Sequence, residues 1–308
     1  DDELMYKIGV KPYISLEYSF YSLIPAKISE ELADKLVQFY SNKLKKDITA
    51  HDKIEFEIVY SSYDFNTWLR TTELLEYGFS SSERKEIVEA LKELTLNNVL
   101  EYNKISLKDT SDIRRLENAR DKIKRKYENC RNAQDLIKGI IELLEDIRKY
   151  GTPQFTRQAR MAFIARSFCS SLVASGWFTK EEMDEFMKNI ATVSSDFEQD
   201  YQKYSAGKIT REAFNKKYGH LRSGTYDIRT DSYNQMVFRP VTGTYKPQKE
   251  KESTYYLDEK TLSEALKSIG FEINSQDFIK FLTVAIESRE YFKFEFTKSL
   301  SLALDLIQ

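Results

Sequence analysis

Residues 217–228 read KYGHLRSGTYDI, and no other stretch of this chain gathers as many residues with special chemistry. Gly219 and Gly224 are two of only 10 glycines in 308 residues. Glycine is used where the backbone turns with positive φ or approaches another group closely. His220 is one of two histidines, and its ring titrates, donates and accepts near neutral pH. The stretch therefore predicts a tightly built loop between helical segments.

This loop has two interpretations. In the structural one, Gly219 ends a helix, His220 is a satisfied loop histidine, and Arg222 forms a pair with Asp227. In the functional one, the same side chains line a site for an anionic or hydroxyl-bearing ligand. Composition and spacing leave both interpretations open.

The composition of the whole chain favours long helices around the loop. It has 10 glycines and 5 prolines, whereas sheets joined by many tight turns need more of both. A chain of 308 residues can bury one large core or two smaller ones. The formal net charge of −2 gives no overall field that would attract nucleic acid or an acidic membrane. The two cysteines are too few for a disulfide framework, which favours a reduced, cytoplasmic setting.

The two ends of the sequence suggest a fragment. No signal-peptide pattern opens the chain, and no run of about 18 apolar residues is long enough to span a bilayer. The sequence starts at Asp1, and it ends in an apolar helical stretch, residues 299–308, that has no cap. We therefore expect this chain to be cut from a longer polypeptide.

Ahead of the loop the pattern is helical with one exception. Ser29 is placed to cap a helix that runs to about Leu44. Residues 54–60 alternate apolar and acidic side chains at period two, which predicts a short strand. Residues 109–150 are helical and heavily charged, and we expect the basic run 120–126 within them to be a solvated helix face.

Helical patterns also flank the loop more closely. A break at Gly151 is followed by a helix predicted from Thr156 to Gly176. Thr179 and Glu182 form a capping-box pattern for a helix that reaches about Tyr204.

Residues 229–257, which follow the loop, are polar and aromatic and indicate a mobile connection that could act as a lid. Two helices are predicted after it, one from Asp258 to Ser268 and one that begins at Ser275.

Searches for catalytic motifs exclude several classes of enzyme. The sequence contains no glycine-rich phosphate loop, no paired-cysteine or helical-histidine metal site and no nucleophile elbow. Two distant histidines and two scattered cysteines argue against catalytic zinc, so we expect no metal site in this chain.

The loop resembles the signature YGHLRPGTYDI of phosphoenolpyruvate-utilising enzymes of the phosphoenolpyruvate synthase and pyruvate phosphate dikinase type. The match comprises Tyr218-Gly219-His220-Leu221-Arg222, then Gly224-Thr225-Tyr226-Asp227-Ile228. Ser223 stands where the signature has proline, which implies a less rigid loop. Residues 51–58, 152–173 and 289–301 look like further segments of the same family, so the resemblance spans nearly the whole chain.

The resemblance implies a three-part enzyme. An ATP-grasp domain binds the nucleotide, a central helical region follows, and a swivelling domain carries phosphate on a histidine. This chain corresponds to the central region alone, and the related rifampicin phosphotransferases hold the phosphate acceptor in that region. The implied partners are the ATP-grasp and phosphohistidine domains of the same polypeptide and a small-molecule acceptor. ATP and magnesium are expected for the full-length enzyme, with no cofactor in this segment.

The resemblance also suggests roles for individual residues. His220 and Arg222 would be catalytic, because a histidine can accept a proton from an attacking hydroxyl and an arginine can clamp an anionic group. The residues expected to bind substrate beside them are Thr225, Tyr226, Asp227, Arg157 and Arg160.

Arg160 lies in the least polar helix, where a guanidinium must pair or face a cavity because a buried unpaired charge is costly. We expect it near residues 219–228. An ion pair to a neighbouring helix is the structural alternative.

The sequence thus predicts a mainly α fold with one small β element near residues 54–60. An N-terminal helical subdomain with the short strand would cover residues 1–105. The main helical domain, residues 106–308, would contain the 219–228 loop and the mobile 229–257 connection. The expected function is the acceptor-side or linker domain of an ATP-dependent phosphotransferase, inactive alone. The alternative is a free-standing helical scaffold that binds a protein partner through tyrosines and phenylalanines.

Overall fold

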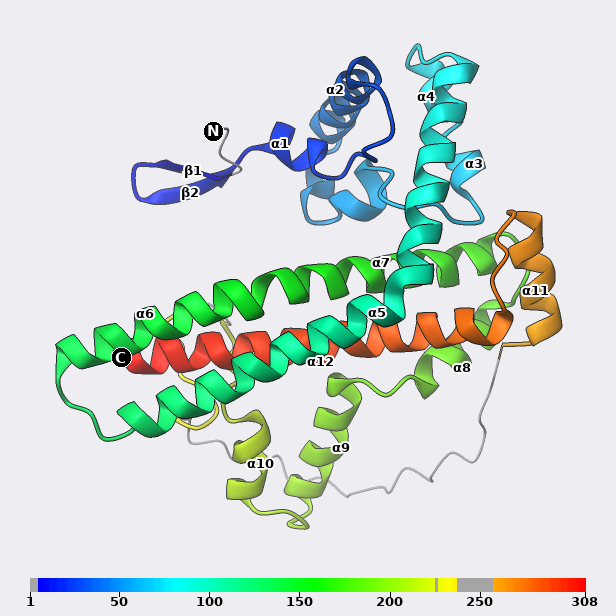
Figure 1. Ribbon diagram of the computed structural model, residues 1–308. Helices are drawn as coiled ribbons and strands as arrows, with labels where there is room; N and C mark the ends of the chain where they lie inside the picture. The colour runs from blue at the N-terminus through cyan, green and yellow to red at the C-terminus, as the bar shows by residue number, and fades with distance from the viewer. Residues whose placement is uncertain (1–4, 225–226, 237–256) are drawn as a thin grey trace. The chain divides into compact units, whose positions relative to one another are not determined.

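The computed structural model describes residues 5–224, 227–236 and 257–308. Within them the fold is mainly α with one two-stranded β-hairpin, which confirms the predicted fold class (Figure 1). In chain order, the elements ahead of the 219–228 loop are β1 Met5–Ile8, β2 Lys11–Ile14, α1 Leu16–Tyr21, α2 Glu30–Lys46, η1 Ile48–Asp52, η2 Ile54–Ile58, α3 Thr67–Arg70, α4 Glu73–Glu76, α5 Ser81–Tyr127, α6 Ala133–Tyr150, α7 Thr152–Ala174, α8 Lys180–Asn189, α9 Val193–Ser205 and α10 Arg211–Tyr218. Those that follow it are α11 Glu259–Ser268 and α12 Ser275–Ile307.

The chain divides into two compact units. Unit 1 comprises residues 1–100, 167–178 and 265–271, and unit 2 comprises residues 101–166, 179–264 and 272–308. The predicted division at residues 105 and 106 separates nearly the same N-terminal part. The prediction placed residues 167–178 and 265–271 in the domain of residues 106–308, whereas they belong to unit 1. These short apolar stretches follow the starts of helices α7 and α11, which lie in unit 2.

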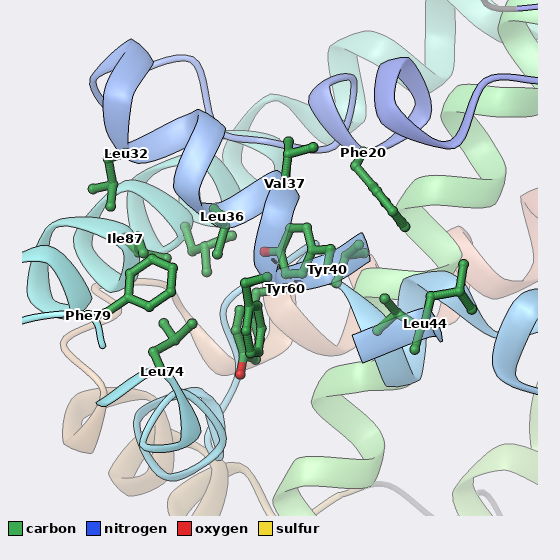
Figure 2. Close-up of a cluster of buried hydrophobic side chains, with 14 of the residues drawn as sticks. Phe20, Leu32, Leu36, Val37, Tyr40, Leu44, Tyr60, Leu74, Phe79 and Ile87 are labelled. Carbon is green, nitrogen blue, oxygen red and sulfur yellow. Dashed lines mark hydrogen bonds between the residues drawn. The ribbon is translucent and has the colours of Figure 1, made fainter. Parts of the chain in front are cut away.

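The core of unit 1 is an aromatic cluster around α2. Ser29 caps this helix by accepting a hydrogen bond from the Leu32 amide, as its sequence position predicts. Figure 2 shows the side chains of α2 meeting Phe20, Tyr60, Leu74 and Phe79. The Tyr40 hydroxyl accepts a hydrogen bond from the Tyr60 amide at 3.1 Å, so this fully buried hydroxyl is satisfied.

The predicted strand at residues 54–60 is wrong in position. Ile54–Ile58 forms one π-helical turn, closed by a hydrogen bond of 3.0 Å from the Val59 amide to the Ile54 carbonyl. In this turn Ile58 is buried while Phe56 is 47 % exposed, although a strand would place both on one face. An alternating pattern also needs a partner strand, and none pairs with this segment among the described residues.

The small β element is instead the hairpin β1–β2, in which Tyr6 lies opposite Tyr13. Gly9 has a φ of 63°, and Val10 has a negative φ, which is the signature of a type II′ turn with glycine at its first central position. All eight strand residues are exposed.

Unit 2 is built on three helices whose apolar faces form one core. Figure 1 shows α6 running alongside α12, and the buried cluster takes Ile113 and Leu116 from α5, Leu143 from α6 and Phe292 from α12. The sequence predicted one helix over residues 109–150. The structure breaks it after Tyr127, and Asn132 caps the new helix α6 by accepting from two backbone amides.

Polar groups are also buried in unit 2. The Arg120 guanidinium donates to the Glu295 carboxylate at 2.5 Å, and both residues are 7 % exposed. The predicted solvated face over residues 120–126 is therefore wrong at Arg120, because α12 covers that position.

None of the helices that the structure describes is both long and apolar enough to cross a membrane.

Candidate functional site

The loop at residues 219–224 is bound to α12 through Arg222. Its guanidinium donates to the Asp305 carboxylate, to the Ser301 hydroxyl at 3.3 Å and to the Thr230 carbonyl at 2.8 Å. The Arg222 side chain is 1 % exposed. A buried guanidinium needs a carboxylate partner, and here Asp305 supplies it. The predicted pair between Arg222 and Asp227 is wrong.

Ser301 joins the same contact from the backbone side. Its hydroxyl donates to the His220 carbonyl at 2.9 Å, while it accepts from Arg222. Burial raises the pKa of the Asp305 carboxyl, and the charge of Arg222 opposes that rise. One face of α12 thus holds the loop at two positions, His220 and Arg222.

The half-buried His220 packs against α12. Its ring lies edge-on to the ring of Phe294, with 4.6 Å between the centroids. Neither ring nitrogen makes a hydrogen bond of good geometry with a described residue. Burial, together with the charges of Lys298 and Arg120, lowers the pKa of His220 to about 3, although the nearby Lys217 carbonyl favours the proton. The ring is therefore neutral at pH 7.

A neutral, enclosed imidazole is a weak general base, because proton transfer is best when the pKa lies near the working pH. The described contacts of His220 and Arg222 are those expected of residues that hold a loop in place. Both residues lie beside the cleft described below, so by holding the loop they also position one wall of that cleft.

Glycine is required at position 219 because neighbouring atoms leave no room for a side chain. Its φ is −61°, which any residue adopts, but a Cβ here would lie 2.0 Å from the Asn234 side-chain oxygen and 2.5 Å from the Asn215 carbonyl. The Asn234 amide donates to the Gly219 carbonyl at 2.9 Å. The start of the predicted mobile connection 229–257 is thus hydrogen-bonded to the loop, and residues 237–256 lie outside the described residues.

Asp227 does not join His220 and Arg222. It forms an exposed pair with Arg229, with nitrogen–oxygen distances of 2.9 and 2.8 Å. This pair holds the pKa of Asp227 at about 2. Thr225 and Tyr226, the other predicted binding residues of the loop, lie outside the described residues. The structure therefore does not bring Asp227 together with His220 and Arg222, beside which it was expected to bind substrate.

A cleft of about 310 Å³ lies next to the loop in unit 2. Aromatic side chains dominate its walls, and a carboxylate and an ammonium group lie among them. Its lining residues are Val193, Ser194, Phe197, Tyr218, Leu221, Tyr233, Glu290, Lys293, Phe294 and Thr297.

Three of the polar groups in this cleft are already engaged. Glu290 accepts from Arg289 at 2.6 Å and from the Ser194 hydroxyl at 3.4 Å. The Thr297 hydroxyl donates back to carbonyls of its own helix, at 2.9 and 3.0 Å. Lys293 is different, since no carboxylate of the described residues pairs with its ammonium group. The cleft therefore combines flat apolar walls with one available positive charge.

Arg157 lies at the edge of a separate network of unit 2, centred on the buried Asp109. Its guanidinium donates to both oxygens of the Asp109 carboxylate, with Nε 3.1 and 3.2 Å from them. Gln158 donates to the same carboxylate at 2.9 Å and accepts from the Tyr102 hydroxyl at 3.0 Å. This bond to Asp109 raises the pKa of Arg157. Asp109 itself is fully buried, so Arg157 neutralises a buried charge.

Arg160 is half-buried on α7 and is not a free guanidinium. Its expected position beside residues 219–228 stays a prediction. Among the residues that the structure describes, no three His, Cys, Asp or Glu side chains are arranged to hold a metal ion.

Sequence reasoning missed the residues that position the loop and the cleft. Phe294, Lys298, Ser301 and Asp305 recur at intervals of four, three and four along α12, which places them on one helix face. Polar residues that recur on one face of an otherwise apolar helix were the available signal.

Comparisons with protein-family models, with curated proteins and with solved structures found no match to this chain.

Proposed function

We propose that this chain is the acceptor-side region of an ATP-dependent phosphotransferase of the phosphoenolpyruvate synthase type, and that the cleft beside Phe294 holds the phosphate acceptor. The observation that carries the proposal is that residues of the loop that resembles the family signature form part of the wall of this cleft. Tyr218 and Leu221 line it, while His220 and Arg222 bind the same loop to α12. The proposal implies a cytoplasmic location, where ATP is present.

The cleft suits an acceptor with a flat apolar part and one anionic group. Phe197, Tyr218, Tyr233 and Phe294 line the cleft, and aromatic linings bind flat ligands through apolar burial and stacking. Lys293 offers a positive charge at the same cleft, and phosphoryl transfer depends mainly on positioned charge. The ATP-grasp and phosphohistidine domains of the same polypeptide would supply the phosphate.

The first test asks whether this segment binds nucleotide by itself. The division of labour in the proposal assigns ATP to another domain, and the sequence has no glycine-rich phosphate loop. Calorimetry with ATP and magnesium is expected to give no measurable heat of binding to this chain. Micromolar affinity would contradict the proposal.

The second test uses the full natural polypeptide and ATP labelled in its phosphates. We expect an acid-labile phosphohistidine to form, and its label to pass to pyruvate or to a compound of the low-molecular-weight fraction of a cell extract. Thr297→Trp fills the cleft, so it should slow discharge of the label tenfold or more while the phosphohistidine forms normally. Leu107→Trp, at a site on α5 that is 75 % exposed, is the control. Absence of the phosphohistidine would overturn the function, and unchanged discharge in Thr297→Trp would overturn the cleft.

A second candidate function is a helical scaffold that binds proteins. The observation in its favour is the number of exposed apolar side chains, with Val10 at 90 %, Leu69 at 73 % and Trp68 at 54 %. The length of the natural open reading frame separates the two candidates. Flanking ATP-grasp and histidine domains support the first, and a complete gene of this size supports the second.

A further inference from the structure

Helix α6 carries more apolar surface than its packing uses. Its buried face contains Leu143 and Ile147, which belong to the core of unit 2. A second row of apolar residues stays exposed, namely Ile137 at 55 %, Ile141 at 52 % and Leu144 at 44 %. We call these three residues the exposed α6 stripe.

The spacing of the stripe is that of a helix-docking surface. Its members follow one another at intervals of four and three residues, so they form one continuous row over two turns. Apolar residues scattered singly over a surface need no explanation, but a contiguous row with polar edges marks a contact site. The remaining question is which partner has a matching surface.

Charges along one edge of the stripe select the partner. Lys138 and Glu145 are seven residues apart, so they lie on the same edge of the helix, two turns from each other. Lys138 is 67 % exposed and has only a local pair with Asp135. Glu145 has no ion pair with any described residue. The edge thus carries a positive and a negative charge at its two ends.

In an antiparallel helix pair related by a two-fold axis, each edge of one helix faces the same edge of the other helix, and the two edges run in opposite directions. With the axis near Ile141, Lys138 of each copy meets Glu145 of the other. The two Ile141 side chains meet at the axis, and Ile137 of each copy lies near Leu144 of the other. The stripe and its charges are therefore complementary to themselves.

We propose that the exposed α6 stripe docks a second copy of this chain, with α6 antiparallel to α6 of that copy. Three apolar residues per chain make a small interface, so the dissociation constant is expected to be micromolar, roughly 1–100 μM. The two reciprocal charge pairs favour the antiparallel arrangement over the parallel one, in which the edge of Lys138 would face the other edge of the second helix.

The experiment is sedimentation velocity of the full chain from 1 to about 300 μM. The wild type is expected to convert from monomer to dimer over this range. Ile141→Glu places two carboxylates at the axis and should weaken the dimer at least tenfold, while Leu107→Glu, exposed on α5, should leave it unchanged. Circular dichroism checks that each variant is folded, and Ile137→Glu replaces Ile141→Glu if that variant is not.

A charge exchange tests the antiparallel direction. Lys138→Glu should weaken the dimer, and the double variant with Glu145→Lys should restore it, because the reciprocal pairs re-form with opposite sign. In a Cys130→Ser background, Ile141→Cys should form a disulfide-linked dimer. A wild type that stays monomeric at 300 μM, or an Ile141→Glu dimer of unchanged affinity, would overturn the proposal.

Discussion

Arg222 donates a hydrogen bond to the carboxylate of Asp305, which lies 83 positions further along the chain. The arginine side chain is 1 % exposed and that of Asp305 is 36 % exposed. Because the two partners differ in exposure, they also differ in what their loss leaves behind. Removing Asp305 strands a buried positive charge, whereas removing Arg222 leaves a carboxylate that water can reach.

We expect Asp305→Ala to lower the free energy of unfolding by about 3 kcal/mol, as for other buried pairs that lose one partner. Urea denaturation followed by circular dichroism measures it. Asp231→Ala, at an exposed position one residue from the Thr230 carbonyl that also binds Arg222, should change the value by less than about 0.5 kcal/mol. An Asp305→Ala variant as stable as its control would show that the pair does not hold the loop.

The half-buried His220, whose two ring nitrogens are shielded from solvent, makes stability depend on pH. Its pKa is about 3 in the folded chain, below the ordinary histidine value of about 6.5. The unfolded chain therefore binds a proton more readily, so this contribution is complete above pH 6.5 and is lost as the pH falls toward 3. Between pH 7 and 4 the loss is expected to be on the order of 3 kcal/mol.

His220→Phe should remove this part of the pH dependence, since phenylalanine fits an aromatic environment and does not titrate. The measurement is the urea midpoint at pH 7, 6, 5 and 4 for both proteins. His51→Phe, which changes an exposed histidine, is the control and should follow the wild type. Parallel curves for all three proteins would contradict the burial of the His220 ring.

Gly139 illustrates a competition between helix propensity and packing. Alanine in the middle of a helix is favoured over glycine by about 1 kcal/mol. At this position of α6, however, a Cβ would lie 2.6 Å from the ring of Tyr127, which is itself only 5 % exposed. We expect Gly139→Ala to destabilise the chain by about 1–3 kcal/mol, as overpacking does. A thermal melt gives the sign directly, and a higher melting temperature would mean that Tyr127 moves aside freely.

Arg157 can be tested for a structural role without an assay of activity. Its loss leaves the buried Asp109 with Gln158 as a donor, so Arg157→Ala should cost about 2–3 kcal/mol of stability. Asp109→Asn removes the charge, and adding it to Arg157→Ala should recover part of the loss. Urea titrations of the two single variants and the double variant form a cycle. Strictly additive effects would show that the two residues do not interact.

Local signals predicted the helical fold well. The capping box of Thr179 and Glu182 is formed as its spacing indicates, because both of its hydrogen bonds lie within four residues. The helix predicted to continue to Tyr204 breaks after Asn189, where Thr192 and Ser195 form a second capping box. Serine at the third position is a weaker signal than glutamate, so this cap was missed.

Long-range contacts explain what the sequence could not predict. Arg120 was assigned to a solvated face from its charged neighbours, but its partner Glu295 lies 175 positions away. Arg222 was paired with Asp227 because that aspartate is near in sequence, whereas tertiary structure brings Asp305 to it. The dense loop at residues 217–228 was correctly singled out as unusual, but nothing within the loop indicates which positions of α12 it contacts, because Ser301 and Asp305 lie 81 and 83 positions from their partners.

The polar contacts of α12 also set the register of this helix. Apolar side chains of similar size tolerate a slide along a neighbouring helix, but one residue of shift moves every side chain by about 1.5 Å along the axis and 100° around it. Such a shift would separate Glu295 from Arg120 and Asp305 from Arg222 together. The two ion pairs therefore fix both the axial position and the rotation of α12 in unit 2. The loop at residues 219–224 keeps its position only while α12 keeps this register.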